Sequence, residues 1–385
     1  MEYENTRLAD YTEDAAIGRG SFDLPFAILT LLLLLIGVVM VLSASYARAY
    51  YSSVTGNKAT YYFVRQLVFA IGGVGVMFIV SKFPMAFYRR ISPTIMGIAL
   101  VTLLAVPFIG SKVNGARRWI DLGFTTFQPS EIAKVAVIMY FAMLICKYKG
   151  RMKTFRYGIV PFGGILILIV GLLVLEPHFS ASVIIIAIGA VMLFLGGARL
   201  IWFIGGIAVA GGGLAIIMTF FPYASDRINA WRDPFAYMQG DGYQIVQSLY
   251  SIGSGGLLGL GLGQSRQKYL YLPEEHNDFI FSVICEELGF IGAIAILILF
   301  ALLIIRGYWL AMHMRDRYSV LVTAGITTLL ALQVILNVAV VTNLIPSTGI
   351  SLPLFSYGGT ALLIQLAEMG IVLSASRDIP AKVSG

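Results

Sequence analysis

Residues 24–44 read LPFAILTLLLLLIGVVMVLSA, and this stretch contains no charged side chain. A helix needs about 20 mainly apolar residues to cross the hydrocarbon core of a bilayer, where every backbone N–H and C=O must find its partner within the segment. The stretch therefore predicts a transmembrane helix. About twenty residues of mixed character precede it, unlike the short basic start and small-residue cleavage site of a signal peptide. We expect the helix to be retained and residues 1–23 to form a cytoplasmic segment.

Further stretches of similar length and composition follow along the chain. Of the 385 residues, 58% are hydrophobic and 12% are charged, whereas soluble domains have roughly 45–50% apolar and about 25% charged residues. The predicted fold class is an all-α integral membrane protein with about ten transmembrane helices, in a single polytopic membrane domain at 24–376. The helices are expected at about 24–44, 62–81, 92–110, 129–146, 158–175, 181–197, 200–220, 277–305, 319–343 and 357–376.

The basic residues between these stretches predict the orientation of the chain. Lys and Arg concentrate in the cytoplasmic loops of membrane proteins, and the densest basic cluster is residues 147–156, between the fourth and fifth helices. Placing this cluster inside puts both termini, including the tail at 377–385, in the cytoplasm. The longest connection, 221–276 between the seventh and eighth helices, then becomes a large extracytoplasmic loop.

Charge and cysteine content exclude several other classes of protein. The formal net charge of +7 comes mostly from Lys and Arg between apolar stretches, where they meet anionic lipid headgroups rather than nucleic acid. Cys146 and Cys285 lie in or beside different predicted helices, so neither a disulfide framework nor a cysteine metal site is predicted. Three histidines do not suggest a histidine-rich metal site either. No cofactor is required by these patterns, and a carboxylate-bound divalent cation, Mg²⁺ or Mn²⁺, is left open.

A basic segment with a tryptophan precedes the fourth helix. Residues 111–121, SKVNGARRWID, carry three cations on the predicted outer side, against the trend of the positive-inside rule. One interpretation of Trp119 is a platform on which a sugar stacks. The alternative is an interfacial anchor, in which the tryptophan and its basic neighbours reach the headgroup region of the bilayer.

The fourth helix itself begins with ionisable side chains. It starts in the sequence QPSEIAK, residues 128–134, with a proline suited to the first helical turn. Glu131 and Lys134 are three residues apart, so they share a helix face and are predicted to pair just below the outer surface. Ionisable groups inside lipid mark function by default. The alternative is a salt bridge that only fixes helix packing.

The long outer loop runs directly into the eighth helix through residues 270–281, LYLPEEHNDFIF. Asp278 is expected at the lip of the membrane, either as a general base or as a first-turn carboxylate that interacts with the helix dipole. Glu286 and Glu287 lie deeper in the same helix, and Glu368 lies in the last helix. These three are expected either to hold helices together or to relay protons.

The connection between the ninth and tenth helices, residues 343–360, reads NLIPSTGISLPLFSYGGT. Non-helical backbone at membrane depth is tolerated only inside protein or beside a wet cavity, so one interpretation is a re-entrant loop that helps to wall the site. A plain tight loop is the other. The glycine-rich stretch 253–263 lacks the Lys-Ser/Thr of a P-loop, and we assign it no nucleotide.

Together these segments resemble the shape, elongation, division and sporulation family of polytopic peptidoglycan polymerases, which includes FtsW, RodA and SpoVE. The resemblance spans nearly all ten predicted helices, and residues 261–268, GLGQSRQK, are more similar to the division and sporulation branches than to the elongation branch. Asn277 stands where threonine is more usual in the family. The most specific motifs are GARRWI at 115–120, QPSE with Lys134 at 128–134, LPE with DFIF at 272–281, EELG at 286–289, and LP with SYGG at 352–359.

The resemblance implies that lipid II, a disaccharide peptide linked to undecaprenyl pyrophosphate, is polymerised into glycan strands at the outer face of the bacterial cytoplasmic membrane, at the division septum. Asp278 matches the family's essential acidic residue, and Trp119 matches a second functionally important position. A carboxylate base and nearby cations suit this chemistry, because the 4-hydroxyl of one sugar must lose its proton as it displaces a lipid pyrophosphate. The other substrate-binding candidates are Arg117, Arg118, Ser130, Glu131, Lys134, His276, Ser356 and Tyr357.

The implied partners are a class B penicillin-binding protein, the transpeptidase that cross-links new strands, and other membrane proteins of the division complex. One alternative function is a lipid II flippase, for which the deep glutamates would matter most. Another is a non-catalytic scaffold for the transpeptidase, for which Asp278 would be dispensable. Transporter sites lie near the bilayer midplane, whereas the polar residues here gather mainly in the outer half, so an enzyme is favoured.

The predicted orientation can be tested by cysteine labelling. Gly150→Cys and Gly240→Cys are introduced separately into a chain whose Cys146 and Cys285 are replaced, and intact cells are treated with an impermeant thiol reagent. We expect labelling at 240 and protection at 150, because the basic cluster 147–156 faces the cytoplasm. The reverse pattern would refute the topology.

Overall fold

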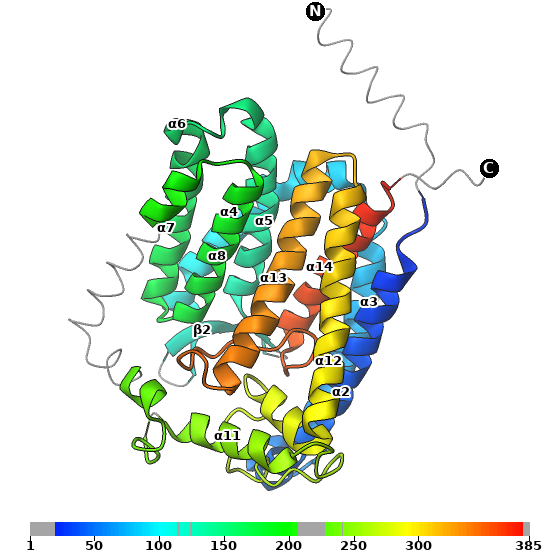
Figure 1. The fold of residues 1–385 in the computed structure, drawn as a ribbon, viewed down its shortest axis with the longest axis vertical. Coiled ribbons are helices and arrows are strands. Elements are labelled where there is room, and N and C mark those ends of the chain that lie inside the picture. Colours follow the sequence, from blue (N-terminus) through cyan, green and yellow to red (C-terminus); the bar gives the residue numbers. More distant parts are fainter. Residues whose placement is uncertain (1–19, 114–115, 124, 207–227, 241, 380–385) are drawn as a thin grey trace, which may run out of the picture.

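The computed structural model describes residues 20–113, 116–123, 125–206, 228–240 and 242–379. Eight helical segments in this part of the chain are long and apolar enough to cross a membrane, and the apolar helix α8 is slightly shorter. The predicted membrane fold is thus a bundle of long helices (Figure 1). Its helices are α2 (Leu24–Tyr51), α3 (Tyr61–Val80), α4 (Met85–Ile109), α5 (Pro129–Lys147), α7 (Val160–Leu175), α8 (Phe179–Leu195), α12 (Ile280–His313), α13 (Arg317–Val341) and α14 (Gly359–Ser376).

Shorter elements lie at the two ends of this bundle. The sheet strands β1 (Ser111–Val113), β2 (Ala116–Asp121) and β3 (Thr126–Phe127) and the helix α11 (Tyr243–Gly255) lie at one end, and α6 (Phe155–Gly158) lies at the other (Figure 1). Single-turn 3₁₀ helices span Ser53–Thr55 and Lys149–Arg151. The backbone N–H of Gly20 donates to the carbonyl of Arg377 at 3.1 Å, so both ends of the described chain lie together, and their cytoplasmic location stays a prediction.

Most predicted helices coincide with observed ones, and the differences have physical reasons. The third helix is predicted at 92–110, but α4 begins at Met85 and includes Arg89 and Arg90, which a hydropathy pattern treats as an interruption. Of the seventh predicted helix, at 200–220, residues 207–220 lie outside the described residues. The count of ten therefore stays a prediction.

A small antiparallel sheet is an addition that the all-α prediction does not include. Strand β2 is central, with Lys112 of β1 opposite Arg117 and Phe127 of β3 opposite Ile120. The turn after β2 is closed by Gly123, whose N–H donates to Asp121 Oδ1 at 2.8 Å and whose φ is +84°. The sheet pairs the backbone of the segment that carries Arg117, Arg118 and Trp119.

The glycine-rich stretch 253–263 packs backbone against backbone on a break in α12. Gly289 has φ +67° and ψ −173° inside that helix, and a β-carbon there would lie 2.2 Å from the N atom of Gly259. The N–H groups of Leu260 and Gly261 donate to the carbonyls of Glu286 and Glu287 at 2.9 and 3.0 Å. Glycine permits this close approach and the positive φ, which gives the stretch a structural role.

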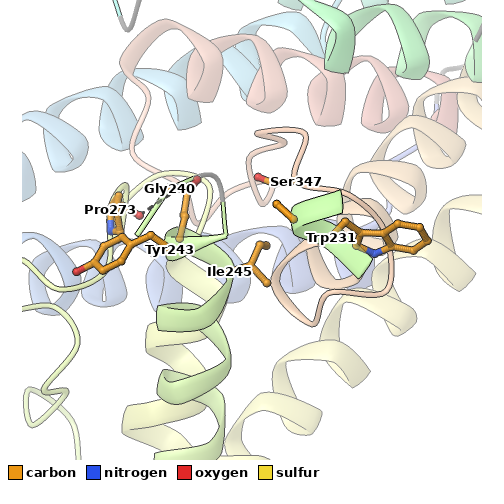
Figure 2. A pocket seen from close by; sticks show the side chains of 8 residues that line it. Trp231, Gly240, Tyr243, Ile245, Pro273 and Ser347 are labelled. Atoms are coloured by element: carbon orange, nitrogen blue, oxygen red, sulfur yellow. Dashed lines mark hydrogen bonds between the residues drawn. The ribbon is translucent and has the colours of Figure 1, made fainter. Parts of the chain in front are cut away.

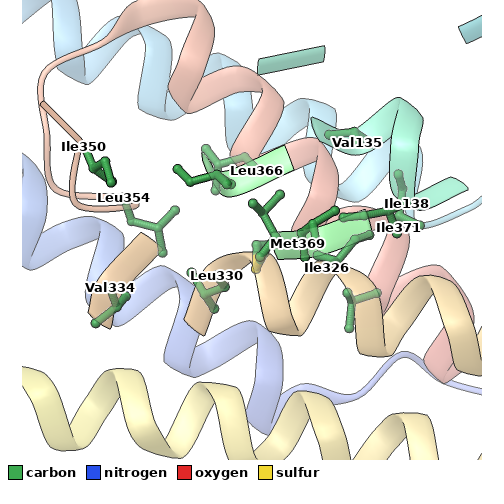
Figure 3. Close-up of a cluster of buried hydrophobic side chains, with 14 of the residues drawn as sticks. Val135, Ile138, Ile326, Leu330, Val334, Ile350, Leu354, Leu366, Met369 and Ile371 are labelled. Carbon is green, nitrogen blue, oxygen red and sulfur yellow. The ribbon is translucent and has the colours of Figure 1, made fainter. Parts of the chain in front are cut away.

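The connection between α13 and α14 folds back among the helices, as the re-entrant interpretation predicts. Leu352, Leu354 and Phe355 have exposed fractions of 0–1%, and Figure 3 shows Leu354 near side chains of α13 and α14, such as Val334 and Leu366. The loop approaches α2 at Gly37, where a β-carbon would lie 2.3 Å from the carbonyl oxygen of Leu354. The N–H of Leu354 donates to Gln365 Oε1 at 2.9 Å, because a buried backbone group needs a partner.

Candidate active site

Asp278 ends a tight turn immediately before α12. The N–H groups of Asn277 and Phe279 both donate to the carbonyl of Glu274, at 3.0 and 3.2 Å, and Glu274 has φ +55°. The helix begins at Ile280, and within the described chain no side chain caps it. Among the described residues, nothing donates a hydrogen bond to the Asp278 carboxylate. The Asp278 carboxylate therefore does not cap the helix start through a hydrogen bond, whereas its interaction with the helix dipole stays a prediction.

Three neighbouring groups hold the backbone of this turn. Asn337 of α13, fully buried, donates from Nδ2 to the carbonyls of Asp278 at 2.8 Å and Ile350 at 2.6 Å. The hydroxyl of Ser356 donates to the carbonyl of Asn277 at 2.7 Å, and the N–H of Tyr357 donates to the carbonyl of His276 at 2.8 Å. The turn that carries Asp278 is thus fixed by α13 and by the re-entrant loop.

The re-entrant loop also forms a wall beside the carboxylate. A β-carbon on Gly349 would lie 3.1 Å from Asp278 Oδ2, and Gly349 has φ +63°. Gly349 is exposed and Asp278 is partly exposed, so this wall leaves access to the carboxylate from outside. A side chain at position 349 would narrow that access and strain the backbone.

The electrostatic surroundings of Asp278 favour its protonated form. Burial raises the pKa of Asp278 to about 7, with a further contribution from the negative charge of Glu274 and an opposing one from the positive charge of Arg118. The electrostatic interaction with Arg118 places the basic segment of β2 near the aspartate. A carboxyl with a pKa near 7 is matched to accepting and releasing protons at physiological pH.

The side chains of β2 reach the ends of neighbouring helices. Arg117 is exposed and donates to the carbonyl of Pro107 at 2.8 Å. Arg118 donates to the carbonyl of Pro177, between α7 and α8. Trp119 is partly exposed, and its carbonyl accepts a hydrogen bond from the Ser111 hydroxyl at 3.1 Å. The sheet therefore presents two guanidinium groups and an indole at the end of the bundle that holds Asp278.

Glu131 and Lys134 form the predicted ion pair. Lys134 Nζ lies 2.8 Å from Glu131 Oε2, with side-chain exposed fractions of 3% and 9%. Ser130 precedes them at 1% exposure, and its hydroxyl has no hydrogen-bond partner among the described residues. Glu368 of α14 lies within electrostatic range of both charges. The first turn of α5 thus places a buried, polar cluster below the sheet.

Two residues at the corner between α7 and α8 are not among the predicted site residues. Glu176 has an exposed fraction of 1%, and in the described part of the chain neither of its carboxylate oxygens has a partner. Burial raises the pKa of Glu176 to about 8, against the opposing charge of Arg118. Burial, together with the positive charges of Arg118 and Lys134, lowers the pKa of His178 to about 3, which favours its neutral form. An acidic residue and a histidine after a helix of only apolar residues are the signal that could have found them.

His276 lies among aromatic rings, and its Nδ1 lies 3.6 Å from Oε1 of the neighbouring Glu275. Its ring lies 4.7 Å from that of Tyr62 and 5.7 Å from that of Tyr357, between centroids. The neighbouring Glu275 is fully buried and accepts two hydrogen bonds from Arg48 of α2, at 2.7 and 2.8 Å. These contacts hold the turn; substrate contact by His276, Ser356 and Tyr357 stays a prediction.

The deeper glutamates of α12 are engaged in hydrogen bonds and ion pairs. Glu287 accepts from Lys268 Nζ at 2.9 Å and from the Ser43 hydroxyl at 2.7 Å. Glu286 accepts from the Ser265 hydroxyl at 2.5 Å and from the Arg266 N–H at 2.9 Å. Both glutamates are buried. They join α12 to α2 and to the outer loop, as one of the two interpretations predicts.

Within the described part of the chain, no three His, Cys, Asp or Glu side chains gather as a metal site. The carboxylate-bound divalent cation therefore remains a hypothesis that these side chains neither identify nor require. Near the Asp278 carboxylate, the structure places one cationic side chain, that of Arg118.

Comparison with known proteins shows to which family the chain belongs. The sequence model of the Cell cycle protein family FTSW_RODA_SPOVE matches residues 24–379. The chain belongs to this family. It is 40% identical to stage V sporulation protein E of Bacillus subtilis, covering 92% of this chain and 97% of that one. It is 39% identical to the probable peptidoglycan glycosyltransferase FtsW of Trichlorobacter lovleyi, covering 93% and 94%.

Solved structures agree with the fold. A structure described as a peptidoglycan synthase complex that coordinates polymerization and crosslinking has a TM-score of 0.77 at 27% identity, covering 93% of this chain and 98% of that chain. The rod shape determining protein RodA of Thermus thermophilus has a TM-score of 0.68 at 27% identity, covering 94% and 98%. The predicted family, the multi-pass membrane fold and the glycosyltransferase class of enzyme are confirmed.

The buried pair of Glu131 and Lys134 should behave as one unit. Removing one charge leaves the other unpaired in a low-dielectric surrounding, which typically costs about 3–5 kcal/mol, whereas removing both avoids that cost. We expect the effects of Glu131→Gln and Lys134→Met on thermal unfolding to be non-additive by about 1–3 kcal/mol. A control cycle combines Lys134→Met with Asp23→Asn, whose partner is Arg306. Additive effects in the first cycle would contradict the pairing.

Proposed function

We propose that this glycosyltransferase polymerises lipid II at the outer face of the cytoplasmic membrane, with Asp278 as its general base. In the step proposed, the Asp278 carboxylate takes the proton from the 4-hydroxyl of one substrate's sugar. The oxygen forms a bond to the anomeric carbon of a second lipid-linked saccharide. The bond from that carbon to the pyrophosphate oxygen breaks, and undecaprenyl pyrophosphate leaves with the electron pair.

The observation that carries this proposal is a partly exposed carboxylate that no described residue hydrogen-bonds, on a backbone held by Asn337 and Ser356. Two other acidic side chains of this region are already engaged: Glu131 pairs with Lys134, and Glu275 pairs with Arg48. A general base needs a free lone pair and a pKa near the working pH. Asp278 meets both requirements.

The basic residues of β2 supply the complementary charge. A pyrophosphate leaving group gains negative charge as its bond to the sugar breaks, and fixed cations stabilise that charge. Arg118 lies in electrostatic range of Asp278, and Arg117 is exposed on the same strand. We assign both guanidinium groups to the pyrophosphate and the Trp119 ring to a sugar. Ser130 and the Glu131–Lys134 ion pair form the polar side of the proposed site that lies deeper in the bundle.

The relatives suggest where the enzyme acts and with which partner. Its similarity to a stage V sporulation protein and to FtsW proteins supports work in septal wall synthesis. The structurally similar synthase complex that coordinates polymerization and crosslinking supports a class B penicillin-binding protein as partner, together with other division-complex membrane proteins.

The two alternative functions are less well supported. A flippase would use the deep glutamates, of which Glu286 and Glu287 are held by fixed partners and Glu368 lies near the Glu131–Lys134 pair. A scaffold would have no use for an unpaired, partly buried carboxylate, because burying such a group costs stability. Recruitment of the transpeptidase is compatible with catalysis and accompanies it in this proposal.

Replacing the base should abolish strand synthesis without loss of the fold. We expect Asp278→Asn to lower polymerisation of purified lipid II, in the presence of the transpeptidase partner, by about 10²–10⁴-fold. Asp121→Asn, an exposed change at the end of β2, is the matched control and should stay near wild type. Complex formation with the partner is checked on the same preparations. Near-normal polymer from a folded Asp278→Asn complex would move the base to another residue.

The activity should also depend on pH through Asp278. The base acts only when ionised, so with a pKa of about 7 the rate should rise about tenfold per pH unit below pH 7 and level off above it. Glu274→Gln should shift this profile to lower pH, because it removes a charge that raises the pKa. A flat rate profile from pH 5 to 8 would contradict the assignment.

The same raised pKa predicts a pH-dependent stability. An aspartate in an unfolded chain titrates near pH 4, so a native pKa of about 7 means that stability is lost as pH rises from about 4 to about 7. Asp278→Asn removes the ionisable group and should therefore gain thermal stability relative to wild type at pH 8. The melting temperatures of both proteins at pH 5 and pH 8 measure this. If the difference in melting temperature between variant and wild type were the same at both pH values, the burial of the Asp278 charge would be contradicted.

A further inference from the structure

A cavity of about 220 Å³ lies between the outer loop and the re-entrant loop. Figure 2 shows its walls: a helical turn at 228–232, the first turn of α11, the segment that leads to Asp278, and the re-entrant loop. Its lining does not include the cluster of Arg118, Glu131 and Lys134. The residues that line it are Ala230, Trp231, Gly240, Tyr243, Gln244, Ile245, Pro273 and Ser347.

Hydrogen bonds hold the walls of this cavity in place. Trp231 Nε1 donates to the carbonyl of Asn343 at 3.1 Å, and Asn343 Nδ2 donates back to the carbonyl of Trp231 at 3.2 Å. Gln244 Nε2 donates to the carbonyl of Pro273 at 3.4 Å. These bonds link the outer loop to the re-entrant loop and to the segment that leads to Asp278. The same two segments therefore form the cavity and surround Asp278.

The cavity is close to Asp278 along both of these segments. Ser347 is two residues before Gly349, whose α-carbon lies beside the Asp278 carboxylate. An extended chain advances about 3.3–3.6 Å per residue, so the α-carbons of Ser347 and Gly349 are at most about 7 Å apart. Pro273 is five residues before Asp278 and adjoins the Glu274 turn. The cavity therefore lies about one or two sugar units from the reacting centre.

The lining indicates the chemistry of the ligand. None of the described residues that line the cavity is charged, so none of these side chains would pair with a pyrophosphate or with the charged groups of a stem peptide. Two partly exposed aromatic side chains, Trp231 and Tyr243, present flat surfaces; the negative faces of such rings attract weakly polarised C–H groups. The amide of Gln244, whose Nε2 donates to Pro273, keeps its oxygen for a neutral donor. A volume below the roughly 300–1,000 Å³ of most ligand pockets fits a single monosaccharide unit.

We propose that this cavity is a saccharide subsite that holds one N-acetylated hexose of the glycan strand, one or two units from the bond that is being formed. The assignment rests on the proposed function and goes beyond it, because it names a second binding site on the same strand. Holding a distal sugar keeps the strand on the enzyme between additions. Loss of the subsite should therefore shorten strands more than it slows the first addition.

The test uses the full-length protein and a soluble probe, the β-1,4-linked N-acetylglucosamine tetrasaccharide. Binding is measured by titration calorimetry for wild type, Tyr243→Ala, Tyr243→Phe and Asp278→Asn. We expect Tyr243→Ala to weaken binding about tenfold, which corresponds to about 1.4 kcal/mol. Tyr243→Phe keeps the ring, and Asp278→Asn leaves the cavity intact, so both should bind like wild type. In the polymerisation assay, Tyr243→Ala should give shorter strands at a near-normal initial rate.

A second variant keeps the test decisive if Tyr243→Ala does not fold. Ala230→Leu adds carbon atoms at a lining position that is 3% exposed and should block the probe and shorten the strands in the same way. Wild-type binding and strand length in a folded Tyr243→Ala or Ala230→Leu protein would overturn the subsite while leaving the proposed function intact. Absence of polymer from wild type with its partner would overturn the proposed function, and probe binding would still decide the subsite.

Discussion

The side-chain amide of Asn337 is the interaction on which the active end of this molecule depends. It lies inside α13, fully buried, and its two N–H groups reach the carbonyls of Asp278 and Ile350. One bond fixes the turn that carries the carboxylate, and the other fixes the loop that forms its wall. A buried carbonyl left without a partner costs about 1–3 kcal/mol, so the amide makes one arrangement of these two irregular segments much more stable than others.

The interior of the bundle has a low dielectric constant. Its ionisable groups therefore fall into two classes, those paired with an opposite charge and those without a partner. Pairs such as Lys268 with Glu287, and Arg48 with Glu275, neutralise each other and join distant segments of the chain. A charge without a partner in such surroundings shifts its pKa and becomes neutral instead. Asp278, with no hydrogen-bond donor in the described chain and a pKa raised to about 7, belongs to the second class. The desolvation that makes ion pairing favourable for the other groups also raises the pKa of Asp278, as the proposed role of general base requires.

Irregular backbone at membrane depth is accommodated in two ways. The re-entrant loop is covered by helices and uses side chains such as Gln365 as backbone partners. The break in α12 at Gly289 is instead satisfied by the backbone of the glycine-rich stretch, whose own N–H groups donate to α12. Both solutions give irregular backbone its partners within the protein, because the hydrocarbon offers none to unpaired N–H and C=O groups.

The sequence by itself is sufficient for the helices, the family motifs and the candidate base. Long apolar stretches must be helical in lipid, and an i,i+3 spacing is enough to place Glu131 and Lys134 on one helix face. The sequence does not identify Asn337, Glu176 or His178 as residues near the candidate site. Nor does it show that Ser356 and His276 hold the turn that carries Asp278. Each of those roles depends on a partner far away in the chain, such as Ile350 for Asn337 or Tyr62 for His276. Hydropathy and residue spacing reflect the free energy of one segment in lipid or water. Only the tertiary structure decides which buried polar groups meet. It also decides which of them lack a hydrogen-bond donor among the described residues, as the Asp278 carboxylate does.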